Sequence, residues 1–170
     1  MPSGQAVIGF DGTAVSERAV RAAGELLAPR PVLVVVAVEE GEAFASLIAP
    51  LGAAGLPATE LEIRNALRAE AEIVQQAVRT TQKGVALAEE VGLEAEGLTV
   101  ADDVPPAETL LRVAEARDAP VIVVGPHRRG VLSELLVGST AKDLLKRSPR
   151  PVLVVREQPP EGSEGDRPDE

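Results

Sequence analysis

The chain has 170 residues, a formal net charge of −10 and no cysteine. This length suits one domain with a single core, and the acidic charge argues against attraction to nucleic-acid backbones across the whole surface. The absence of cysteine excludes disulfides, thiolate catalysis and cysteine-ligated metals. Two Phe, without Trp or Tyr, leave no aromatic platform for base stacking. Nucleic acid is therefore not an expected partner.

The first part of the chain alternates apolar runs with helical spacing. Residues 5–10 predict a short buried strand, and residues 14–27 predict a helix that Pro29 and Pro31 end. Residues 32–38 are apolar at every position, which is typical of a strand buried on both faces. Residues 39–58 hold no period and are rich in Gly and Pro, so we expect an irregular excursion with one helical turn near 43–47.

A long helix is predicted over residues 59–91, with Gly92 as its stop. One apolar face steps along it by four and three residues: Leu67, Ala71, Val74, Val78, Thr81, Val85 and Ala88. Residues 93–100 then alternate between apolar and polar, which predicts a strand with one more exposed face.

The last third of the chain continues the alternation. Residues 101–106, "ADDVPP", predict a loop, and Pro106 suits the first turn of a helix that runs to about Arg117. We expect a buried strand at 120–125, a helix at 138–147 and a final strand at 151–155. Residues 157–170 are rich in Pro, Gly and acid, so we expect a disordered tail behind a single domain of residues 1–156.

This order predicts an α/β fold, with an open parallel sheet covered by helices on both faces. Ligands of such sheets bind beyond the carboxyl ends of the strands, where the strand order reverses. The first and fourth strands are the natural pair to flank that point, and Asp11 and Gly125 follow them directly. No period of 20–50 residues repeats, so a solenoid is excluded.

Two glycine-containing segments are candidates for a phosphate site. Gly125 permits a positive φ and close approach of a ligand to the backbone. Gly138-Ser139-Thr140 stands at a predicted helix start, where free N–H groups and a partial positive charge suit phosphate. A plain helix cap explains the same three residues.

Several segments between residues 5 and 156 follow the pattern of one known family. They are "VIGFDGTAVSERAV", "PVLVVVAVEE", "PPAETLLRVAEARDAPVIVVG", and Gly125 followed after twelve residues by Gly138-Ser139 and "AKDLL". With these segments the chain resembles the universal stress protein family. The resemblance implies a Rossmann-like fold with five parallel strands in the order 3-2-1-4-5, and a homodimer joined through the last strand, residues 151–155.

The resemblance also implies a ligand, ATP or AMP, which Mg²⁺ can accompany, across the first and fourth strands. By position, Asp11 would hold ribose or lie beside the phosphates, and the backbone near Ala37 would read the adenine edge. The implied nucleotide-binding residues are Asp11, Gly12, Thr13, Ala37, Gly125, His127, Arg128, Arg129, Gly130, Gly138, Ser139 and Thr140. The implied role is regulation of a stress response; no catalytic residue or metal ligand is assigned, and an enzyme is not expected beyond slow ATP hydrolysis.

One departure from the family pattern leaves two functions open. The pattern is glycine, two residues, glycine, nine residues, glycine, then Ser or Thr, and its second glycine falls at Arg128. A side chain there opposes positive φ by about 1–2 kcal/mol, although a guanidinium pairs well with phosphate. Pro126 also removes one backbone N–H. The alternative to nucleotide binding is a dimeric interaction module whose groove is altered by Arg128 and Pro126.

Other candidate sites have simpler interpretations. His127 is the one histidine and is best explained as a solvated loop residue. Asp102 and Asp103 can bind metal or act as acid and base, but a loop leading into a helix start is favoured. An adenylating or pyrophosphatase enzyme needs a Ser-Gly-Gly loop or a histidine pair, and a receiver domain needs an acidic cluster. "FDGTAVS" contains none of these.

The first residues and the apolar runs bear on location. "MPSGQAVIGF" lacks the basic region and long apolar run of a signal peptide. No apolar run approaches the length of a membrane span. We therefore expect a cytoplasmic protein without a membrane partner.

Overall fold

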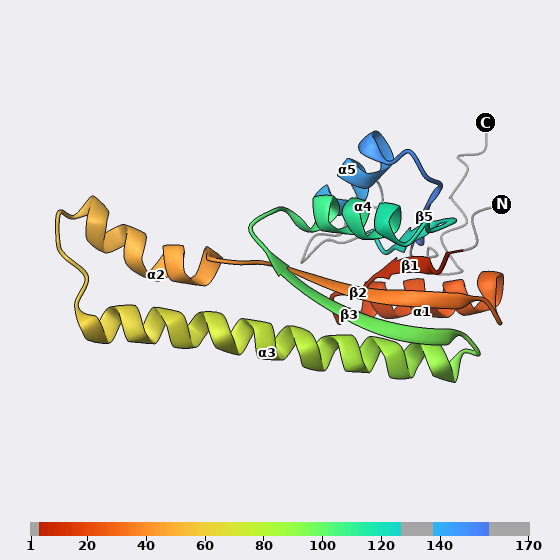
Figure 1. Cartoon of the computed structure of the whole chain (residues 1–170), viewed down its shortest axis with the longest axis horizontal. Coiled ribbons are helices and arrows are strands. Elements are labelled where there is room, and N and C mark those ends of the chain that lie inside the picture. Colours follow the sequence, from red (N-terminus) through yellow and green to blue (C-terminus); the bar gives the residue numbers. More distant parts are fainter. Residues whose placement is uncertain (1–3, 127–137, 157–170) are drawn as a thin grey trace, which may run out of the picture.

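The fold is an open, parallel five-stranded sheet with helices on both faces (Figure 1). The structure is a computed structural model, and it describes residues 4–126 and 138–156. The strands are β1 (Ala6–Gly9), β2 (Pro31–Glu39), β3 (Glu94–Asp102), β4 (Ile122–Val124) and β5 (Val152–Val154). The helices are α1 (Ala14–Leu27), α2 (Glu42–Ala53), α3 (Glu60–Glu90), α4 (Pro106–Ala116) and α5 (Ser139–Arg147). The strand order is β3-β2-β1-β4-β5, so the predicted fold class and topology are confirmed.

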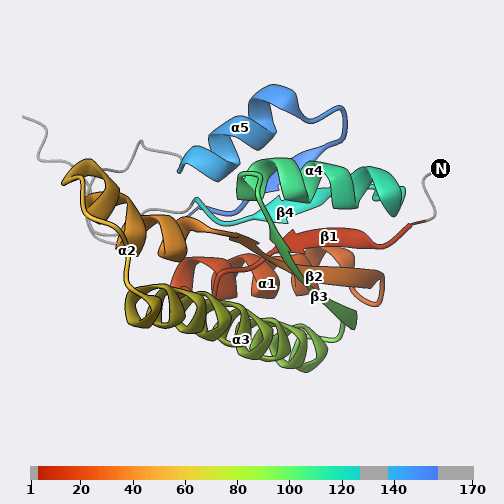
Figure 2. The ribbon, with the colours of Figure 1, turned by 60° about the vertical axis from the view of Figure 1, so that its left-hand side comes forward.

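The parallel register divides the core into two layers. Val7, Leu33 and Ile122 are register partners and lie on the face covered by α4 and α5. Ile8 and Val34, one residue further along their strands, lie on the opposite face, with α1 and α3. Figure 2 shows these helix pairs on opposite sides of the sheet. Because successive side chains alternate between the faces, strands that are apolar at every position supply both layers.

After β2 the chain leaves the sheet, and it packs against the sheet again only in the second half of α3. α2 and the beginning of α3 form a helical hairpin that extends beyond the sheet in both views (Figures 1 and 2). The first residue of α3 in the core is Ala77, so we define the arm as α2 together with residues 60–76. Ala66 is the one residue of the arm that is fully buried among those the structure describes.

α2 corrects the prediction that residues 39–58 are irregular. The 12-residue helix forms although Pro50 lies within it. Its first turn is held from α3: the Glu70 carboxylate accepts hydrogen bonds from Gly41 N at 2.8 Å and Phe44 N at 3.3 Å. A carboxylate at a helix start satisfies N–H groups that the helix leaves free. This contact spans 29 and 26 residues, so local sequence spacing does not reveal it.

β3 is longer than predicted. Residues 101 and 102, expected in a loop, extend the strand because Ala101 and Asp102 pair with Val38 and Glu39. α3 begins as the sequence indicated, with a capping box in which Thr59 Oγ1 accepts from Glu62 N at 3.3 Å and the Glu62 carboxylate accepts from Thr59 N at 2.7 Å. In the described ranges, no helix is both long enough and apolar enough to cross a bilayer.

Candidate functional site

The candidate site lies where β1 and β4 end beside each other. The last register pair between β1 and β2 is Gly9 with Val35, whereas β2 continues to Glu39 beside β3. β1 lies between β2 and β4. The helix that follows β1, α1, covers one face of the sheet, and the helix that follows β4, α5, covers the other. This confirms that the first and fourth strands flank the point of strand reversal, and it brings the turn after β1 and the residues after β4 to the same edge.

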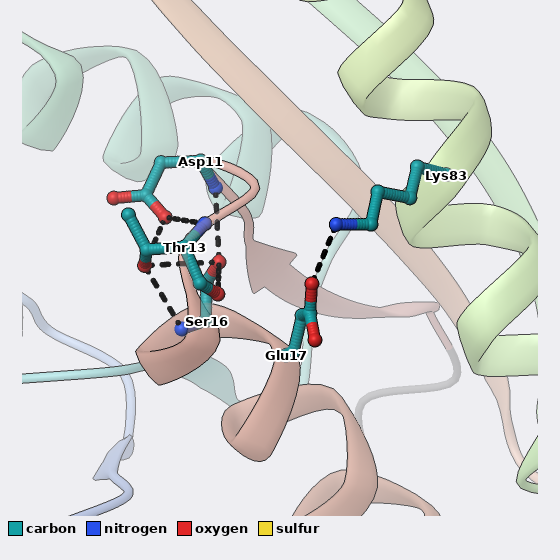
Figure 3. Close-up of polar contacts among 5 residues, drawn as sticks. All are labelled: Asp11, Thr13, Ser16, Glu17 and Lys83. Atoms are coloured by element: carbon teal, nitrogen blue, oxygen red, sulfur yellow. Dashed lines mark hydrogen bonds and ion pairs between the residues drawn. The ribbon is translucent and has the colours of Figure 1, made fainter.

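The turn after β1 is organised by Asp11 (Figure 3). The Asp11 Oδ1 atom accepts from Thr13 N at 3.0 Å and from the Thr13 hydroxyl at 2.6 Å. Thr13 is the N-cap of α1, and its Oγ1 accepts from Ser16 N at 3.3 Å. The Ser16 hydroxyl donates to the Thr13 carbonyl at 3.0 Å. By position Asp11 was expected in the ligand site; the structure shows that it shapes the turn, with its side chain exposed at the point of strand reversal.

The start of α5 is capped differently from the start of α1. Gly138 is its N-cap and makes no side-chain capping bond, and the first turn contains no acidic residue. Lys146 and Arg147 lie in the last turn, where positive charge complements the helix dipole. α1 thus begins with a hydroxyl cap and a carboxylate beside it, whereas α5 begins with neither. Of these two helix starts, the α5 start is the one suited to an anion.

Gly125 is required by packing. A Cβ added at Gly125 would lie 2.6 Å from Val15 Cγ1 and 3.0 Å from the Val15 carbonyl oxygen, in the first turn of α1. Gly125 is not among the described glycines with positive φ, so the contact with Val15, and not the backbone conformation, requires glycine there. The end of β4 approaches α1 so closely that no side chain fits, which holds the residues after β4 against the turn of Asp11.

Ala37 lies beyond the end of β1, on β2. The Val35 carbonyl accepts from Phe10 N at 2.9 Å, so the polar backbone groups of Val35 point toward β1. Backbone direction alternates along a strand. The N–H and C=O of Ala37, two residues later, therefore point the same way, past the last paired residue of β1. A flat heterocycle placed there would meet one donor and one acceptor.

α3 supports the site from the side of α1, a feature that sequence reasoning missed. Gly12 has φ +79°, and a Cβ there would lie 3.1 Å from Thr80 Cγ2. Lys83 Nζ donates to Glu17 Oε1 at 2.5 Å across α3 and α1 (Figure 3). These residues are 66 positions apart in the sequence, and no motif joins them.

The remaining candidates fall into two groups. His127, Arg128, Arg129 and Gly130 lie outside the described residues, as does the expected tail at 157–170. The Asp102 carboxylate accepts from Arg112 Nη1 at 3.3 Å and from Asp103 N at 2.8 Å. Within the part of the chain that the structure describes, no group of three His, Cys, Asp or Glu is placed to hold a metal ion.

Comparison with known proteins places these features in context. The model of the universal stress protein family matches residues 4–156. The chain is 30% identical over 106 residues to the universal stress protein MJ0577 of Methanocaldococcus jannaschii, an alignment that covers 62% of this chain and 63% of that protein. The chain thus spans under two thirds of this curated relative's length in sequence. A solved MJ0577 structure superposes with a TM-score of 0.69 at 22% identity, covering 93% of this chain and 99% of that one.

Two further structures contain bound nucleotides. The universal stress protein from Archaeoglobus fulgidus in complex with dAMP has a TM-score of 0.59 and 23% identity, covering 91% of this chain and 98% of that chain. A universal stress protein in complex with cAMP has a TM-score of 0.57 and 23% identity, covering 90% and 97%. At these identities the likeness establishes the shared fold.

Proposed function

Because the chain belongs to the universal stress protein family, we propose that it is a regulatory protein that binds an adenine nucleotide at the switch point between β1 and β4. The observation that carries the proposal is the start of α5, which has no side-chain cap and no acidic residue in its first turn. Solved relatives of this fold contain dAMP and cAMP. The α5 start would receive the phosphates, since helix N–H groups and the dipole both favour negative charge.

Residues at the ends of the strands would hold the other parts of the nucleotide. The Asp11 carboxylate repels phosphate but can accept hydrogen bonds, so it would contact the ribose hydroxyls and not the phosphates. The backbone of Ala37 would meet the adenine edge, and Gly12, Thr13 and Gly125 would line the groove between. Ser139 and Thr140 would add hydroxyl donors at the phosphates. Mg²⁺ would be carried in by ATP, because the described residues form no metal cluster of their own.

Assembly and location complete the proposal. β5 is an outer strand, and Val152, Leu153 and Val154 are only half-buried. An apolar edge of this kind favours pairing with another chain. We therefore expect a homodimer joined through β5, residues 151–155, acting in the cytoplasm in a stress response, without catalytic turnover as its main output.

The test is calorimetric titration of the protein with ATP and with AMP, with Mg²⁺ present. We expect micromolar binding that Gly138→Val abolishes, because the added side chain covers the first-turn N–H groups of α5. Gly52→Val is the matched control: it lies on α2, and a Cβ there meets nothing within 4 Å. Absence of heat with either nucleotide in a folded protein would reject the proposal.

A second candidate, an interaction module that binds no nucleotide, is favoured by Pro126, which has no backbone N–H to offer directly after Gly125. Arg128→Gly separates the two functions. If the guanidinium pairs with phosphate, this substitution weakens nucleotide binding. If it blocks the groove, the substitution creates or strengthens binding.

A further inference from the structure

The predicted apolar face of α3 is only partly used by the fold. Thr81 and Ala88 are buried against the sheet, and Val74 and Val85 are half-buried. Leu67 and Val78 remain 58% and 42% exposed, and Ala71 is exposed as well. These residues continue the same alternation of three- and four-residue steps, which is the spacing of a seam between two helices. The first turn of α2 is held through Glu70, which lies on another side of α3 from these exposed residues.

A groove continues this seam beside the edge strand β3. It has a volume of about 400 Å³ and lies between α3 and β3, lined by Val78, Gln82, Val85, Gly97 and Thr99, among others. Gly97 deepens it: a Cβ there would lie 2.7 Å from Thr81 Cγ2 and 2.9 Å from Val85 Cγ2. β3 ends the sheet on this side. The exposed seam and the groove thus form one continuous surface.

The charges beside the seam have opposite signs at its two ends. Arg64 and Arg68 lie at the N-terminal end, where Arg64 also pairs with Glu60 at 2.7 Å, so this end keeps one excess positive charge. Glu89 lies at the C-terminal end, in the wall of the groove. Between them the seam is flanked by the uncharged Gln75 and Gln82. The seam is therefore uncharged along its middle and has ends of opposite sign, although the whole chain has a net charge of −10. When two copies lie antiparallel, the positive end of each seam meets the negative end of the other.

We propose that this seam binds the same seam of a second copy of the chain, with the two α3 helices antiparallel about a two-fold axis that crosses the seam between Val74 and Val78. Helix geometry then places Val74 beside Val78 of the second copy and Leu67 level with Val85 and its groove. Arg64 comes level with Glu89 of the second copy at both ends. The contact lies at the β3 side of the sheet, opposite the β5 edge, and it does not involve the nucleotide groove.

Sedimentation equilibrium of the full chain tests the contact. Leu67→Asp puts a carboxylate into both halves of the seam, so we expect the dissociation constant of this association to rise by about 100-fold or more. Leu61→Asp is the matched control, because Leu61 is 63% exposed but lies on another side of α3. It should change the constant by less than about threefold, as expected for a substitution outside the contact. Equal effects of the two substitutions would overturn the proposal.

Cross-linking supplies a readout that does not depend on a disruptive substitution. The chain has no cysteine, so Gln75→Cys introduces a unique thiol beside the two-fold axis. A short bismaleimide should join two chains through it. Gln76→Cys, one residue away on the outer side of α3, should give little covalent dimer. Failure of Gln75→Cys to cross-link would overturn the proposal and leave the seam to a different partner.

The outcome is independent of the proposed function. Dimers joined through β5 do not bring the two Gln75 positions together, so they give no cross-link. Nucleotide binding measured on Leu67→Asp should equal that of the unsubstituted chain, because the site and the seam share no residue.

Discussion

Gly84→Ala tests how closely α3 packs against Phe10 and Val34, which lie next to the candidate site. Replacing glycine by alanine in a helix interior ordinarily stabilises by about 1 kcal/mol. Here the added methyl group would lie 2.7 Å from Phe10 Cδ1 and 2.8 Å from Val34 Cγ1. Phe10 is 4% exposed and Val34 is fully buried, so neither side chain has room to move away. Overpacking of this kind destabilises by about 1–3 kcal/mol.

The steric effect should win, because both contacts are shorter than real Cβ contacts and both neighbours belong to the core. We expect a net loss of about 1–2 kcal/mol in the free energy of unfolding, measured by urea denaturation. Gly52→Ala, in α2 with open space around it, should instead be neutral or stabilise by up to about 1 kcal/mol. A Gly84→Ala protein as stable as the unsubstituted chain would refute the close packing of α3 on Phe10.

Substitutions at three further positions probe caps and charges. Thr13→Ala should lower the unfolding free energy by about 1 kcal/mol by removing the cap of α1, while Thr13→Ser, which keeps the hydroxyl, should restore most of it in the same urea titration. Thr59→Ala should speed hydrogen exchange in the first turns of α3 by up to about tenfold, since an N-cap contributes about 1 kcal/mol; unchanged exchange would contradict the capping box. The hydrogen bond from Arg147 lowers the pKa of Glu108 below its ordinary 4.5. The ionised Glu108 carboxylate therefore stabilises the folded state fully above pH 4.5, and this stabilisation is lost as the pH falls through the folded-state pKa. Glu108→Gln should reduce the loss of stability between neutral pH and pH values below 4.5, as followed by urea unfolding across that range.

The sheet was predictable because its signals are local. A run such as residues 32–38, apolar at every position, predicts a strand covered on both faces, and alternation with helices restricts the topology. The period of α3 was equally plain. The period does not say which surface an apolar face packs against: Leu67 and Val78 belong to the predicted apolar face and yet lie exposed.

The missed features depend on contacts between distant residues. α2 was missed because Pro50 and the surrounding glycines mark irregular chain, while the group that holds its first turn, Glu70, lies on the next helix. At the candidate site, the sequence indicated that Asp11 follows the first strand at the point of strand reversal, and the structure places it there. Gly138 was predicted at a helix start and is the N-cap of α5. The sequence suggested positive φ or the approach of a ligand as the reason for glycine at position 125, whereas the contact that excludes a side chain there is with Val15, 110 positions earlier in the chain.

The arm has a consequence for how chain length can vary. Its helices leave the sheet after β2 and rejoin the core at Ala77, and among the described residues they contribute Ala66 alone to the fully buried set. Whole helical turns can therefore be removed from α2 and from the matching part of α3 without opening a hole beneath the sheet. Such a change alters how far the seam reaches but not the residues after β1 and β4. The length of the arm and the geometry at the ends of β1 and β4 can therefore change independently in this chain.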